Sequence, residues 1–143
     1  MAAMQRMRDL PRLARLRPFV QALWASTPEP GAPARPGARE HVLPTGAMHL
    51  VFRLSGPPLR LFDGPQDLEG CCVGHALVGG PRDRFYVRDV SQPAASVGAL
   101  LQPGVSLALF GAPEDVLAGR HTHLADLWGP RAALALGRPQ EAR

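Results

Sequence analysis

A two-residue alternation between residues 47 and 54 is the feature that most constrains how this chain can fold. Large apolar residues occupy every second position there, namely Met48, Leu50, Phe52 and Leu54. Because successive side chains of a strand point to opposite faces of a sheet, the pattern predicts a strand with one buried face. His49 and Arg53 then share the other face.

Further short apolar or alternating runs follow this strand, and Gly, Pro or Asp residues bound them. These runs are residues 59–62, 71–78, 85–90 and 94–101. The turn sequence Ser-Gly-Pro-Pro at 55–58 predicts that the strand at 47–54 and the run at 59–62 form a hairpin. Several short strands at this spacing are typical of a small sandwich or barrel.

The segment before these strands predicts a different kind of structure. Pro11 and Pro18 interrupt a helical apolar pattern, which favours a short helix over residues 11–17 and an extended entry over residues 19–24. Six of the ten residues from Pro28 to Gly37 are Pro or Gly, which predicts a mobile loop.

The segment after Pro103-Gly104 has a helical pattern. It predicts one or two turns over residues 105–110, a helix from Pro113 to Gly119, and a last helix over residues 124–136 that is interrupted at Gly129. The predicted fold class is therefore mainly β (α+β), a small cupin-like sandwich or barrel with short helices at its C-terminal end. We divide it into a basic arm, entry strand and loop (1–39), a β core (40–103) and a helical appendage (104–143).

The positive charge of the chain is concentrated at its beginning. The formal net charge is +4 over 143 residues, and every basic side chain other than histidine is an arginine. Residues 1–39 hold seven of the 16 arginines against Asp9 and Glu29, whereas residues 40–143 hold nine arginines against ten acids. We interpret the first segment as a solvated basic arm, with phosphate or membrane contact as the alternative.

The sequence gives no sign of export or of a membrane span. The first 17 residues carry charges throughout, unlike a secretory signal, and no window approaches the roughly 20 apolar residues of a membrane-spanning helix. A cytoplasmic protein is expected. Cys71 and Cys72 are adjacent, so they form neither a disulfide framework nor a metal-spacing motif, and we interpret both as reduced thiols.

Six fragments resemble the sensor domain of AraC-type bacterial transcription regulators in their order and spacing. They are Leu16-Arg-Pro-Phe-Val-Gln-Ala-Leu-Trp24, Glu40-His-Val-Leu-Pro-Thr-Gly-Ala-Met-His-Leu-Val-Phe52, Val78-Gly-Gly-Pro81, Val97-Gly-Ala-Leu-Leu-Gln-Pro-Gly104, Leu109-Phe-Gly-Ala-Pro113 and Leu124-Ala-Asp-Leu-Trp-Gly129. The resemblance covers roughly residues 16–136. Physically, Pro44-Thr-Gly46 indicates a turn, Pro103-Gly104 a bend from sheet to helix, and Trp128 a packing anchor.

The resemblance implies a cupin-like domain that senses a small-molecule effector or mediates dimerisation. In that family such a domain is joined to two helix-turn-helix motifs that bind DNA. We expect those motifs to be missing from these 143 residues, so no DNA-binding residue can be assigned here and DNA contact would require the missing half. The implied partners are an effector, a second copy of the chain or a full-length regulator.

An enzymatic site is not indicated by the residues. A cupin metal site needs clustered histidines and a carboxylate. The pair His121 and His123 is expected in a connection between two helical pieces, and His41, His49 and His75 converge only if three strands face them inward. Residues 78–81 lack the lysine and helix of a phosphate loop.

Catalytic nucleophiles are not indicated either. Ser91, Ser96 and Ser106 lie outside any nucleophile-elbow context. We therefore assign no catalytic, cofactor-binding or metal-binding residue, and we leave the ligand-binding residues unassigned.

Three hypotheses follow from the sequence. The first is the effector-sensing or dimerisation domain of an AraC-type regulator, with an apolar internal pocket that holds a few polar groups. The second is a stand-alone modulator that pairs with full-length regulators through an exposed apolar patch around residues 105–136. The third is a metal-dependent cupin enzyme.

Overall fold

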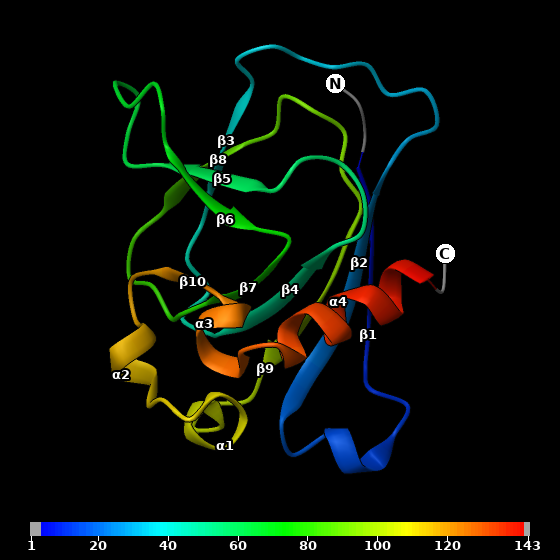
Figure 1. Ribbon diagram of the computed structural model, residues 1–143, viewed down its shortest axis with the longest axis vertical. Coiled ribbons are helices and arrows are strands. Elements are labelled where there is room, and N and C mark those ends of the chain that lie inside the picture. Colours follow the sequence, from blue (N-terminus) through cyan, green and yellow to red (C-terminus); the bar gives the residue numbers. More distant parts are fainter. Residues whose placement is uncertain (1–3, 142–143) are drawn as a thin grey trace.

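The strands of the computed structural model form two antiparallel sheets that pack against each other (Figure 1). The structure describes residues 4–141, with side chains from residue 8 to residue 137. Ten strands and a few short helices lie within this described part. The predicted mainly β class, with short helices near the C-terminal end, is confirmed.

Sheet A is the larger of the two and has six strands. Their order across the sheet is β1 (Met4–Asp9), β2 (Val20–Pro28), β9 (Ser96–Leu101), β4 (His49–Arg53), β7 (Ala76–Gly79) and β10 (His121–His123). Sheet B has four strands in the order β3 (Arg39–Val42), β8 (Tyr86–Asp89), β5 (Leu59–Phe62) and β6 (Cys71–Gly74). All neighbouring strands are antiparallel.

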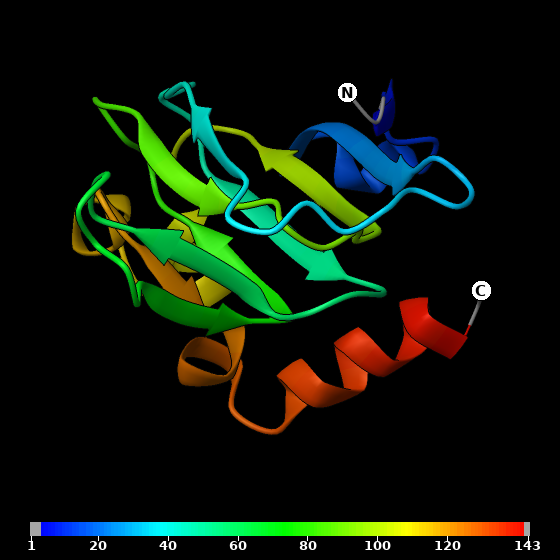
Figure 2. The same ribbon diagram turned by 90° about the horizontal axis from the view of Figure 1, so that it is seen from above.

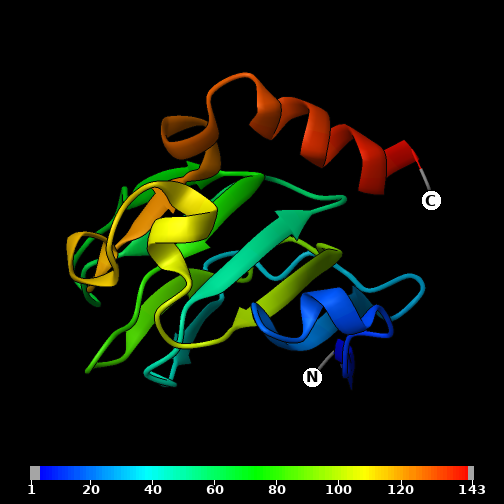
Figure 3. The same cartoon turned by 90° about the horizontal axis from the view of Figure 1, so that it is seen from below.

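The helices lie on one side of sheet A. They are α1 (Ser106–Phe110), α2 (Glu114–Leu117), α3 (Leu124–Trp128) and α4 (Arg131–Glu141), whereas the 3-10 turn η1 (Ala14–Leu16) lies in the connection between β1 and β2 and buries no residue. In Figure 2, α4 lies outside the strands, and in Figure 3, seen from below, α1 lies in front of them. The helices cover the face of sheet A that points away from sheet B.

The main apolar core lies between sheet A and these helices. Its buried members are Val20, Met48, Val78, Ala99, Leu101, Phe110, Leu117, Leu124 and Ala132. Trp128 completes it as the predicted packing anchor, because its Nε1 donates to the Leu109 carbonyl at 2.7 Å and its ring stacks on Phe110. The segment expected as a helical appendage therefore supplies half of the core.

Most of the predicted strands are confirmed, but the predicted hairpin is wrong. β4 lies in sheet A and β5 in sheet B. The backbone N–H of Leu54 donates to Ala95 at 2.7 Å, so the chain stays beside sheet A before the Pro-containing turn takes it across to sheet B. The run at 71–78 is likewise two strands in different sheets, separated after Gly74, whose φ of 82° bends the chain.

Two edge strands were not predicted. Residues 4–9, expected as part of a solvated arm, form β1, and all six of them pair with residues 23–28 of β2. Residues 121–123, expected as a connection between helices, form β10 and pair with β7. Both are edge strands of polar sequence, so neither carries the apolar alternation that reveals a strand.

Candidate functional site

The two faces of sheet A differ sharply in chemistry. Its outer face carries the main core, whereas the face toward sheet B contributes only Val51 and Leu77 to a small apolar cluster with Leu59, Leu61 and Val73 of sheet B. Charged and polar side chains also project between the sheets, beside the buried Leu100. We call these side chains the inter-sheet polar layer, and its members are Glu40, His49, Arg53, Arg82, Tyr86, Arg88 and His121.

The register of sheet A explains how two of these histidines come together. His49 on β4 and His121 on β10 are both paired with Gly79 on the strand between them. Directly paired residues project to the same face, so the two imidazoles flank a position that has no side chain. A Cβ atom on Gly79 would lie 3.2 Å from Nε2 of His121, which shows that the ring leans over this glycine.

Arg82 and Tyr86 complete a compact group around His121, which we call the Arg82 site. The Nη2 atom of Arg82 lies 2.8 Å from Nδ1 of His121, and its guanidinium lies 4.8 Å from the centre of the Tyr86 ring. The rings of Tyr86 and His121 make an edge contact at 4.6 Å. Because Tyr86 belongs to sheet B and His121 to sheet A, the Arg82 site bridges the two sheets.

The Arg82 contact fixes the protonation of His121. A guanidinium can only donate hydrogen bonds, so Nδ1 of His121 is the acceptor and its proton lies on Nε2. Burial, then the charges of Arg82 and His49, lower the pKa of His121 to about 3. The ring is therefore neutral at physiological pH and presents an Nε2–H donor over Gly79.

His49 has a similar environment at the same end of the layer. Burial and then the positive charge of Arg8 lower its pKa. Its Nε2 lies 3.1 Å from the hydroxyl oxygen of Thr45, which also accepts the backbone N–H of Ala47. The turn at 44–46, predicted as a structural element, thus also orients a histidine of the polar layer.

The guanidinium of Arg82 has no carboxylate partner within the part of the chain that the structure describes. Its Nε is buried and makes no hydrogen bond to any described group. Buried cationic donors are normally paired, because water no longer solvates them. Arg82 as a whole is half-buried, and burial lowers its pKa while Tyr86 raises it.

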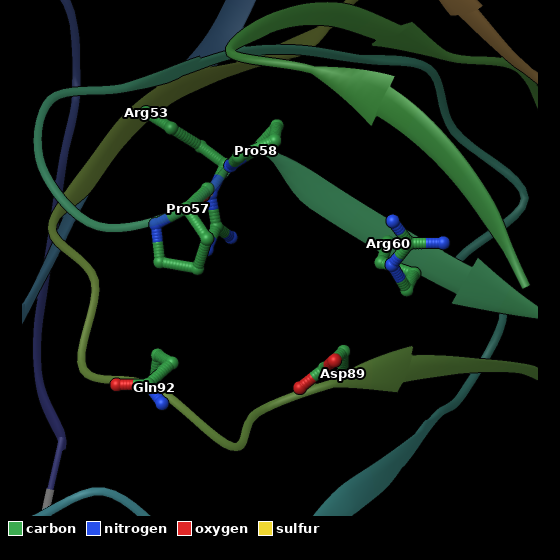
Figure 4. A pocket seen from close by; sticks show the side chains of 6 residues that line it. All are labelled: Arg53, Pro57, Pro58, Arg60, Asp89 and Gln92. Atoms are coloured by element: carbon green, nitrogen blue, oxygen red, sulfur yellow. The ribbon is translucent and has the colours of Figure 1, made fainter. Parts of the chain in front are cut away.

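The opposite end of the polar layer contains a small pocket (Figure 4). Its volume is about 110 Å³, and its walls are Arg53, Pro57, Pro58, Arg60, Asp89 and Gln92. Arg53 is 8% exposed and donates from Nε to the Pro57 carbonyl at 3.0 Å. Burial, then Arg88, lowers the pKa of Arg53, and Asp89 opposes them.

Sheet B contributes an ion pair to the polar layer. Nη2 of Arg88 donates to Glu40 at 3.0 Å, and Nε of Arg88 is buried without a hydrogen-bond partner among the described residues. The polar layer thus carries three arginines, at 53, 82 and 88, across the inside of the sandwich. Two acids lie beside these arginines: Glu40 pairs with Arg88, and Asp89 acts on Arg53.

The histidines considered as metal ligands do not come together at one site. His41 packs on Phe85, and His75 lies 3.2 Å from the Gly56 carbonyl. The expectation that His121 and His123 lie in a connection is wrong, because both are on β10, with His123 beside Gly74 of sheet B. Among the described residues no three His, Cys, Asp or Glu side chains are grouped as metal ligands.

Sequence reasoning missed Arg82, Tyr86 and Gly79. Residues 78–81 were interpreted as a family fragment that lacks the features of a phosphate loop, and the role of Gly79 in giving the His121 ring its space was not predicted. The alternation on β4 did place His49 and Arg53 on one face, as the structure confirms. The pair His121 and His123 was the other sequence feature that could have pointed to this site.

Ser91 and Ser106, considered above as nucleophiles, make hydrogen bonds within the fold. Ser106 is buried and donates to the Ala112 carbonyl at 2.6 Å, and Ser91 donates to Asp89 at 2.5 Å. Cys71 and Cys72 are free thiols. None of the described helices has the length and apolar character needed to cross a bilayer.

The fold and the site define a class: a small two-sheet β domain with a cationic polar layer between its sheets. The chain belongs to the family described as a domain of unknown function, DUF6597, whose model matches residues 10–123. That range contains Gly79, Arg82, Tyr86 and His121. No match was found among curated proteins or among solved structures, so the predicted likeness to cupins stays a prediction.

Proposed function

We propose that this chain is the effector-sensing or dimerisation domain of an AraC-type transcription regulator, and that it acts in the cytoplasm. One observation carries the proposal: arginine and histidine side chains lie between the sheets beside a small apolar cluster, while the main apolar core lies on the other face of sheet A. A sandwich built only for stability fills that space with apolar side chains. The resemblance of the sequence fragments supports the assignment to regulators.

The free energy needed to bury the cations of the polar layer supports a binding role. Each cation removed from water costs several kcal/mol, in rough terms, unless it is well paired. Arg82 and Arg88 both keep a buried Nε without a hydrogen-bond partner among the described groups. Buried donors without a partner need an explanation, and a functional role of the cationic layer is one that fits.

The position of the helices supports a sensing role. The main core joins β4 and β7 directly to Leu124 of α3 and Ala132 of α4. His49 and Gly79 lie on the opposite face of the same two strands. A ligand between the sheets would therefore act on the strands that support α3 and α4, and these helices are the natural route to a partner domain or a second copy.

A reporter fusion tests this function. The chain is fused to a DNA-binding domain that binds its operator only as a dimer, and reporter output is measured with and without a panel of acids, sugars and amines. Output that changes with one compound supports sensing, and loss of that response in Arg53→Met but not in Arg84→Met places it in the polar layer. Output without any response indicates dimerisation alone, and no output refutes the proposal.

A second candidate function is pairing with full-length regulators as a separate modulator. It is favoured by the exposed apolar side chains of Leu107, Val116 and Leu134, on α1, α2 and α4. Light scattering of the purified chain, compared with a Leu107→Ser, Leu134→Ser variant, tests whether these helices form an interface. An unchanged mass in both proteins would argue against pairing through them.

A further inference from the structure

We propose that the pocket shown in Figure 4 binds a small amino acid in its zwitterionic form. Arg60 would bind the carboxylate of the ligand, and Asp89 would bind its ammonium group. We call this cavity the Asp89 pocket. The inference rests on the proposed sensing function and names the chemical class of the effector.

The size of the Asp89 pocket limits the ligand to a few non-hydrogen atoms. Its volume is about 110 Å³, whereas pockets for drug-sized ligands have about 300–1,000 Å³. A water molecule occupies about 30 Å³ in the liquid, so the pocket has the space of roughly three or four waters. An amino acid of the size of glycine or alanine fits this space, and a sugar or a nucleotide does not.

The walls of the pocket are held in place by the fold. Pro57 and Pro58 stiffen one wall, because their rings fix the backbone angle φ. On the other wall, Oδ1 of Asp89 accepts the backbone N–H of Ser91 at 2.7 Å and its hydroxyl at 2.5 Å. The Ser91 carbonyl in turn accepts the N–H of Arg35 at 2.7 Å. The pocket is therefore largely formed before a ligand arrives, which reduces the entropy lost on binding.

Opposite charges line the pocket without neutralising each other. Arg60 lies on β5 and Asp89 at the end of β8, the neighbouring strand of sheet B. In Figure 4, Asp89 and Gln92 lie on one side of the cavity, and Pro57 and Arg60 lie on the other. Within the described part of the chain, Arg60 and Asp89 make no ion pair with each other. A ligand that carries both charges would bridge them.

Arg60 has an edge available for a carboxylate. Its Nη1 donates to the Glu69 carbonyl at 2.6 Å, which restrains the guanidinium. The other edge, formed by Nε and Nη2, makes no hydrogen bond to a described group. Two parallel N–H groups of this kind match the two oxygens of a carboxylate.

Asp89 has an oxygen available for an ammonium group. Its Oδ1 is occupied by Ser91, whereas its Oδ2 makes no hydrogen bond to a described group. An ionised carboxylate is a strong acceptor for an N–H donor that carries a positive charge. Asp89 therefore distinguishes an amino acid from a plain carboxylic acid, whose negative charge it would repel.

The buried Arg53 adds a second positive charge to the walls. Arg53 is 8% exposed, and its Nε donates to the Pro57 carbonyl at 3.0 Å. Two arginines and one aspartate leave the walls with a net positive charge, so an amine without a carboxylate is repelled. The zwitterion is the small ligand that satisfies both signs of charge.

Calorimetric titration of the full chain with matched probes tests the inference. The probes are glycine and alanine, propionate without the amine, ethylamine without the carboxylate, lactate with a hydroxyl in its place, and leucine. We expect glycine or alanine to bind, and propionate and ethylamine to bind about tenfold more weakly or worse, because each loses one charge-assisted contact. Leucine should also bind more weakly, because its side chain exceeds the space. Amide resonances of Ser91 and Gln92 should shift on binding.

Variants locate the binding. Asp89→Asn keeps an oxygen acceptor for Ser91 but removes the charge, and Arg60→Gln removes the guanidinium from a half-exposed position where folding should be kept. Both should weaken amino-acid binding by about tenfold or more. Asp83→Asn and Arg84→Gln are the matched controls, because these side chains are 87% and 84% exposed and should leave binding unchanged.

Each contrary outcome overturns a distinct claim. Propionate or lactate binding as tightly as alanine would overturn the amino-acid class. Unchanged binding in both Asp89→Asn and Arg60→Gln would overturn the location. No binding of any probe at millimolar concentration would show a pocket that holds only water and would overturn the inference. The reporter fusion then decides the proposed function separately, since a response to another compound keeps the sensing role and an unresponsive fusion overturns it as well.

Discussion

The neutral state of His121 makes the stability of this domain fall in mild acid. An unfolded histidine has a pKa of about 6.5, whereas burial and the charges of Arg82 and His49 lower the folded pKa of His121 to about 3. Between these values the unfolded chain binds a proton that the folded chain does not. Protonation therefore favours unfolding, and the contribution of His121 is lost as pH falls below 6.5.

The size of the effect follows from the same two values. The slope is about 1.4 kcal/mol per pH unit once the unfolded histidine is protonated. Between pH 7 and pH 5, His121 should lower the free energy of unfolding by about 2 kcal/mol, a large share of the roughly 5–15 kcal/mol that holds a domain together. The lowered pKa of His49 acts in the same direction.

Urea denaturation of the wild type and His121→Gln at both pH values measures the contribution. We expect the fall in unfolding free energy to be smaller in His121→Gln by about 2 kcal/mol. His41→Gln is the matched control, because it removes an imidazole outside the polar layer. The same fall in wild type and His121→Gln, or an NMR titration of His121 near pH 6.5, would refute the reasoning.

Two further substitutions test the packing that supports the site. Gly80→Ala places a Cβ 1.8 Å from the Leu117 carbonyl oxygen, so it should destabilise the domain by roughly 3 kcal/mol in chemical denaturation, whereas Gly64→Ala, with no atom within 4 Å, should be nearly neutral. Leu124→Ala removes a side chain that is fully buried and should cost about 2–5 kcal/mol, whereas Leu134→Ala, at 68% exposed, should change the melting temperature little. Equal effects within either pair would contradict the assigned packing.

The local elements of this fold were largely predictable from local sequence. The apolar alternation predicted β4. Flanking Gly and Pro residues predicted the limits of β5 and β9, and Pro113 and Gly129 predicted helix boundaries. All of these lie close to their observed positions. Turn geometry and side-chain alternation depend on residues that are close in sequence, so both can be recognised in the sequence itself. The pairing of these elements was not predictable in the same way, as the split of β4 and β5 between two sheets shows.

The candidate site was decided almost entirely by tertiary structure. The sequence by itself determined that His49 and Arg53 share a strand face, because that follows from alternation alone. It did not determine which face is covered by helices and which by sheet B, nor that β10 pairs with β7 and brings His121 over Gly79 beside Arg82. Those contacts join residues about 40 positions apart, and only the register of distant strands sets them.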